Sequence, residues 1–206
     1  MNKLIPITTA GGLGAAGVGG YSLWQLNQKV TFAEQYKNSL LKLEKTDSIL
    51  TFKFTGLQNK TPKHPKLSEA ARRFSETEIA KDLHVEGCED IYSSPVDSSE
   101  YFDDFKQYCS KAIKDVVSNI IAVEKTDTGK WNPKLTLLRS HSESENGKLD
   151  DKLDALKKLL PASSSGSDNF DDNKRESLKQ WCDGIKETLF ISDEEIPLKQ
   201  FKLYCA

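Results

Sequence analysis

Apolar residues along most of this 206-residue chain recur every three or four positions, the spacing of one buried face of an α-helix. This periodicity predicts helices within residues 32–43, 68–88, 99–124, 131–138, 149–160, 178–189 and 198–204. The longest predicted helix is the one within 99–124. Residues 49–54 alternate weakly between apolar and polar and indicate a short strand or an extended connection. The pattern as a whole predicts a mainly all-α fold.

Short signals in the sequence mark where several predicted helices begin or end. Ser75 with Glu78 three residues later is typical of a capping box, in which two side chains bond free backbone N–H groups at a helix start. Gly87 is expected to end that helix. A non-helical break is expected at Thr128-Gly129-Lys130, and a further helix is expected to start at Trp131.

The Ser- and Gly-rich composition around residues 161–173 predicts a loop or linker. With the N-terminal segment set apart, the chain divides into three predicted parts. They are an N-terminal segment at 1–28, a helical region at 29–125 and a second helical region at 126–206.

Residues 4–24 form an uncharged stretch rich in Gly and Ala, and no charged residue follows until Lys29. As a helix this stretch would be about 31 Å long, close to the thickness of the hydrocarbon core of a bilayer. It therefore predicts a single-pass membrane anchor in contact with lipid. Small residues at four-residue intervals would let a second membrane helix approach one face closely. The residues of this predicted packing face are Gly12, Ala16 and Gly20.

Other interpretations of the N-terminal segment are a dinucleotide-binding loop, a cleaved signal peptide and a lipoprotein, of which the lipoprotein is excluded because the first Cys of the chain is Cys88. Residues 12–17 spell Gly-Leu-Gly-Ala-Ala-Gly, the fingerprint of a dinucleotide-binding loop. That loop works only between a strand and a helix, and helical periodicity follows here, so we set this interpretation aside. A cleaved signal peptide stays open as an alternative, although no small-residue cleavage site is evident.

Two segments of the chain, residues 102–109 and 198–205, resemble each other and share the pattern Phe-Lys-x-Tyr-Cys. Each is preceded by another Cys at almost the same interval. Four Cys permit three pairings, and this internal repeat favours one disulfide within each copy. The alternative is that all four are free and buried as small apolar side chains. The predicted bridges are Cys88–Cys109 and Cys182–Cys205.

The balance of 29 basic and 31 acidic residues, a net charge of −2, argues against a nucleic-acid-binding protein. No nucleophile, metal or phosphate-binding motif is found, so no catalytic, metal-ligating or cofactor-binding residue is predicted. His84 and Cys88 are four residues apart and would meet on a helix, but the repeat explains Cys88 better than a catalytic pair does. We expect all three histidines to be solvated surface residues. They are His64, His84 and His141.

The chain resembles a large group of paralogous membrane-anchored proteins of haemotropic mycoplasmas, which have no assigned activity. The resemblance lies in the Met-x-Lys-Leu start, the apolar segment ending at Tyr21, Lys130-Trp131, and the Trp181-Cys182 and Tyr204-Cys205 pairs. It implies membrane association, display at the cell surface and a role in host contact or antigenic variation. It transfers no catalytic residue.

The resulting hypothesis is a non-enzymatic protein of the cell membrane whose C-terminal part lies outside and binds or displays. Lysines after residue 28 favour the opposite orientation under the positive-inside rule, whereas disulfides favour the outside, and we follow the cysteines. The expected partners are the bilayer and a host or envelope protein. Two alternatives stay open, namely a structural component of the envelope that associates through its membrane helix, and an enzyme with an unfamiliar site.

Overall fold

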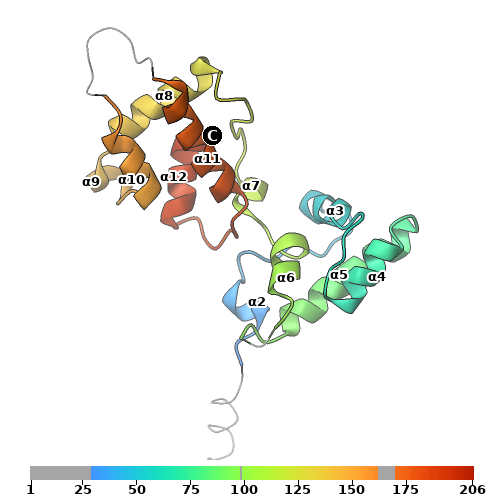
Figure 1. Ribbon diagram of the computed structural model, residues 1–206. Helices are drawn as coiled ribbons and strands as arrows, with labels where there is room; N and C mark the ends of the chain where they lie inside the picture. The colour runs from blue at the N-terminus through green and yellow to red at the C-terminus, as the bar shows by residue number, and fades with distance from the viewer. Residues whose placement is uncertain (1–28, 98, 162–169) are drawn as a thin grey trace, which may run out of the picture.

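The computed structural model describes residues 29–97, 99–161 and 170–206, and this part of the chain is mainly helical (Figure 1). Within it β-pairing is limited to isolated bridges, so the all-α prediction is confirmed for these residues. The helices are α2 (Phe32–Gln35), α3 (Ser48–Thr55), α4 (Pro65–Arg72), α5 (Thr77–Ser93), α6 (Phe102–Tyr108), α7 (Ile113–Val116), α8 (Thr128–Arg139), α9 (Glu143–Asn146), α10 (Asp151–Lys158), α11 (Asp172–Lys186) and α12 (Ile196–Cys205).

The helices form two lobes, with α2 to α6 in one and α8 to α12 in the other (Figure 1). Each lobe has its own cluster of buried apolar side chains. The first cluster gathers around Phe32, Leu67 and Phe105, and the second around Trp131, Trp181 and Phe201. The two tryptophans are core residues, 1% and 5% exposed.

The two lobes share a sequence at the start of their first long helix. Residues 44–47 and 124–127 both read Glu-Lys-Thr-Asp. In each copy the Asp is the N-cap whose side chain accepts backbone N–H bonds, at the start of α3 and of α8. The Lys of each copy pairs with the Cys-bearing helix of its own lobe, Lys45 with Asp82 at 2.6 Å and Lys125 with Glu176 at 3.5 Å.

A polar contact between a buried side chain and a helix N-cap is also common to both lobes. In the first lobe the Asp104 carboxylate on α6 accepts the backbone N–H of His64, the N-cap of α4, at 2.7 Å. In the second lobe the Gln200 amide oxygen on α12 accepts the backbone N–H of Asp150, the N-cap of α10, at 3.0 Å. The last helix of each lobe therefore satisfies a backbone donor where the second long helix begins.

The lobes meet where three extended segments pair side by side. The backbone N–H of Lys111 donates to the Ser39 carbonyl at 2.7 Å, and its own carbonyl accepts the N–H of Phe190 at 3.0 Å. The Ser39 hydroxyl also bonds the Phe190 carbonyl. Residues 39, 111 and 190 come from distant parts of the sequence, so this junction fixes how the second lobe sits on the first.

The helix predicted over residues 99–124 is wrong in its middle and over its last part. The chain forms two short helices there, α6 and α7, separated by non-helical residues 109–112, and residues 117–124 are not helical. The junction between the lobes explains this break, because the backbone N–H and carbonyl of Lys111 form hydrogen bonds with Ser39 and Phe190 instead of with residues of a helix. Tertiary pairing outweighs the apolar periodicity here.

Other predicted boundaries in the first lobe also differ from the structure. The helix within residues 32–43 is only α2, which ends at Gln35. Residues 49–54 belong to a helix, α3, so the predicted strand or extended connection is wrong. The Asp47 side chain accounts for this, since it caps the backbone N–H groups of Ile49 and Leu50 at 2.9 Å each.

The predicted helix within residues 68–88 is divided into α4 and α5. Glu76, which makes no side-chain cap, precedes α5, so the capping box predicted at Ser75 is wrong. Gly87 does not end the helix but lies buried inside α5. A Cβ there would come within 2.8 Å of Leu67 Cδ2, so the missing side chain lets α4 approach closely.

In the second lobe the predicted interruption at residues 128–130 is wrong, because these residues form the first turn of α8. The other predicted helices of this lobe correspond to α10, α11 and α12. The bounds of α11 differ, because it begins at Asp172, inside the loop predicted over residues 161–173, and ends at Lys186. Residues 162–169 of that loop lie outside the described residues. The membrane helix predicted for residues 4–24 lies outside the described residues. No described helix combines the length and apolar character needed to cross a bilayer.

Candidate functional site

Each lobe is closed by one buried disulfide between its longest helix and the end of its last helix. Cys88 of α5 is bonded to Cys109, which directly follows α6, and Cys182 of α11 is bonded to Cys205 of α12. The Cα–Cα distances are 5.2 and 5.7 Å, ordinary for a disulfide. The pairing that the internal repeat predicted is the one found, and all four cysteines are bonded.

The first disulfide has a histidine beside it and the second does not. His84 lies one turn before Cys88 on α5 and is 1% exposed. Its Nε2 donates to the carbonyl oxygen of Tyr108 at 2.9 Å, next to Cys109. A ring nitrogen of His84 and both disulfide sulfurs lie within 4.8 Å of one another. In the second lobe Leu178 holds the place of His84, four residues before the Cys.

The prediction that the histidines are solvated is wrong for all three, since none is more than 6% exposed. His141 is tied between elements, with Nε2 donating to the Gly147 carbonyl at 2.8 Å and Nδ1 bonded to the Tyr204 hydroxyl at 2.6 Å. Burial raises the pKa of that tyrosine to about 12. His141 thus holds the loop before α10 against α12.

His64 and His84 are shielded from water, and desolvation lowers the pKa of each imidazole. His64 packs edge-on against the ring of Tyr101, and its Nδ1 is buried without a hydrogen-bond partner. The nearby Asp90 carboxylate, 3.8 Å from Nε2, opposes the effect of burial on the His64 pKa. The groups that His64 and His84 contact lie on other elements of the first lobe.

An open groove of about 630 Å³ runs along the junction of the lobes. Phe52 of α3 stands at its edge, 58% exposed. Lys114 lies over that ring, with Nζ 5.7 Å from the ring centroid, and pairs with Glu187 at 2.6 Å. The groove offers one exposed aromatic face and charges of both signs, including those of Asp103 and Lys106.

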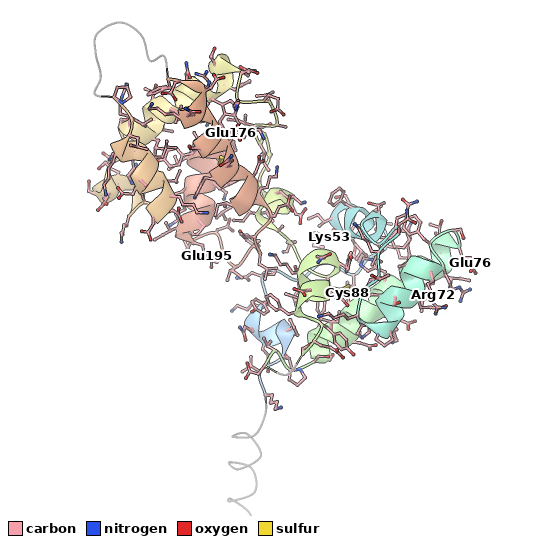
Figure 2. All side chains as sticks on the ribbon, in the orientation of Figure 1. Lys53, Arg72, Glu76, Cys88, Glu176 and Glu195 are labelled. Atoms are coloured by element: carbon pink, nitrogen blue, oxygen red, sulfur yellow. A yellow bond between two sulfur atoms is a disulfide. The ribbon has the colours of Figure 1, made fainter. Side chains whose placement is uncertain are left out.

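A buried ion pair between α3 and α7 lies at the junction of the lobes. Lys53 Nζ of α3 lies 2.8 Å from Asp115 Oδ2 of α7, and both side chains are under a tenth exposed. The same carboxylate accepts the backbone N–H of Ala112 at 2.7 Å. Figure 2 shows Lys53 on α3, on the side that faces α6 and α7, and Cys88 within the first lobe. Each charge is therefore paired where water is excluded.

The paired acids in the sequence lie at helix starts, where a negative charge complements the helix dipole. Asp150 and Asp171 are N-caps whose side chains bond the N–H of Lys152 and Lys174. Tyr108 and Tyr204 are buried beside their cysteines. The predicted membrane packing face, Gly12, Ala16 and Gly20, lies outside the described residues.

Several features were missed by sequence reasoning. The sequence indicates the His84–Cys88 contact and the Cys88–Cys109 bridge separately, but the cluster of all three residues, which the two together imply, was missed. The shared Glu-Lys-Thr-Asp at 44–47 and 124–127 was a readable signal for a longer repeat. The buried pair of Lys53 and Asp115 had no local signal, since exposed lysines and acids look the same in the sequence.

Comparisons with known proteins add no relative. No family model matches this chain, and neither the curated proteins nor the solved structures contain a significant match.

Proposed function

We propose that this chain is a non-enzymatic surface protein, anchored in the cell membrane by residues 4–24. Its body, built from two related helical lobes, is displayed outside the cell. It acts by binding a host or envelope protein or by presenting a charged surface, and the groove beside Phe52 is its candidate contact surface.

The observation that carries the proposal is the pair of buried disulfides at equivalent places in the two lobes. Disulfides persist in oxidising surroundings and are rare where thiols are kept reduced. All four cysteines are buried, so each bridge lies within the core of its lobe. An oxidising location outside the membrane accounts for both lobes at once.

The anchor and the orientation come from the sequence. The uncharged stretch at 4–24 is long enough to span a bilayer as a helix. Lys29 and the lysines that follow it would ordinarily favour the cytoplasmic side. The proposal gives more weight to the disulfides, because they join residues of the folded body itself.

Limited proteolysis of intact cells tests the proposal. A tag at the C-terminus reports the body, and the exposed Arg72–Glu76 turn between α4 and α5 is a suitable cleavage region for trypsin. We expect the full-length band to disappear from unbroken cells while a cytosolic control protein survives. If the segment after Lys29 resists the protease in unbroken cells and is cut only after lysis, the proposed topology is wrong.

A further inference from the structure

His84, Cys88 and Cys109 form a cluster of metal-ligand residue types in which a disulfide joins the two sulfurs. Imidazole nitrogen and two thiolates form one of the ligand sets that Zn²⁺ uses, with a fourth position left for water. His84, Cys88 and Cys109 supply these three donors within 4.8 Å of one another, and all three residues are at most 1% exposed. In the oxidised protein the two sulfurs are bonded to each other, so neither is a thiolate.

We propose that reduction of the Cys88–Cys109 bond turns this cluster into a binding site for one Zn²⁺ or a similar thiophilic divalent cation. The site goes beyond surface display, because it gives the first lobe a state that depends on redox conditions and metal together.

The chemistry balances with a dithiol as reductant. Its two thiols give up two electrons and become a disulfide, while the Cys88–Cys109 bond accepts these electrons and breaks. The two cysteine sulfurs then bind the metal as thiolates, and two protons are released to solvent. His84 binds the metal through its unprotonated ring nitrogen and carries its single proton on the other nitrogen.

The geometry supports the site because its ligands are already positioned. His84 and Cys88 are four residues apart on α5, so they share one face of that helix. Cys109 is brought to them by α6, whose Phe105 and Tyr108 are buried in the first core. Thiolates released at this place therefore remain next to the imidazole.

The second lobe is a built-in control. Cys182 and Cys205 form the equivalent disulfide between the longest and the last helix of the second lobe. The residue one turn before Cys182 is Leu178, where the first lobe has His84. With two donors instead of three, this lobe should not hold the metal. Of the three proposed ligand positions, the two lobes thus differ only at the histidine.

The test uses Co²⁺ as a spectroscopic probe on the full-length protein, reduced with a dithiol that is then removed without oxygen. We expect one Co²⁺ per chain, a thiolate-to-cobalt charge-transfer band and the visible bands of a tetrahedral ion, all lost on adding Zn²⁺. The oxidised protein should show none of these bands. Because losing an outer-shell partner of a metal ligand already costs about 10–100-fold in affinity, His84→Leu should weaken binding by at least about tenfold.

A gain-of-function variant supplies the second arm. Leu178→His should give the second lobe the missing donor and raise the binding to two Co²⁺ per chain. Far-UV circular dichroism covers the case in which reduction loosens the fold, since Co²⁺ should then restore helix in the wild type but not in His84→Leu. The proposal is overturned if the reduced wild type shows no charge-transfer band, or if His84→Leu binds Co²⁺ as tightly as the wild type.

Discussion

The ion pair between Lys53 and Asp115 gives a sharp test of how the lobes are joined. Both side chains are under a tenth exposed, and their charged atoms lie 2.8 Å apart. At that distance, with an effective dielectric constant of about 20, the attraction is about 6 kcal/mol. Much of it offsets the loss of hydration, yet removing one partner leaves the other charge buried and costs about 3–5 kcal/mol.

We expect Lys53→Met to lower the free energy of unfolding by that amount, which is a large share of the stability of an ordinary domain. Lys199→Met is the matched control, because Lys199 pairs with Glu194 on the surface with half or more of each side chain exposed. Such a pair is worth about 0–1 kcal/mol. Urea unfolding followed by circular dichroism, with the disulfides intact, measures both.

The double variant Lys53→Met with Asp115→Asn separates the charge from the packing. Asn keeps an oxygen for the backbone N–H of Ala112 but carries no charge. The double variant should therefore be more stable than the sum of the single losses predicts. If Lys53→Met costs no more than Lys199→Met, the pair is not a buried link and the reasoning fails.

Three further predictions concern single sites. Gly87→Ala should destabilise the protein by about 1–3 kcal/mol, because the added Cβ would overpack against α4. Gly184→Ala is the control, since its Cβ would meet open space, and it should stabilise the protein by about 0.5–1 kcal/mol. Equal effects of the two variants in urea unfolding would contradict the close approach of α4 to α5. Burial lowers the His64 pKa, so below about pH 6.5 the unfolded chain binds more protons than the folded one and stability should fall. The loss of stability between about pH 7 and about pH 5 should be smaller in His64→Asn than in the wild type. The same shift of the urea midpoint in both proteins would refute this. Replacing Cys182 and Cys205 together by Ala should cost about 3 kcal/mol in non-reducing calorimetry, and an unchanged melting temperature would count against a stabilising bridge.

The sequence predicted best where a helix depends on its own residues. α10 and α11 keep an apolar stripe and an Asp N-cap, so local pattern and final structure agree. The disulfide pairing was also predictable, because the repeated Phe-Lys-x-Tyr-Cys linked each late Cys to an early one.

The sequence failed where distant segments decide. Lys111 sits in a strong helical pattern, yet its backbone bonds go to Ser39 and Phe190. His141 looked solvated within a polar stretch, but Tyr204 and Gly147 enclose it. Nothing near either residue signals such partners, since they are set by how the lobes and helices pack.

The state of the cysteines in the living cell tests the central claim most directly. Unbroken cells are denatured in the presence of a thiol-alkylating reagent, and the peptides are mapped without reduction. The account predicts no alkylated cysteine and two bridged peptide pairs, Cys88 with Cys109 and Cys182 with Cys205. Four alkylated cysteines in the full-length protein would contradict it.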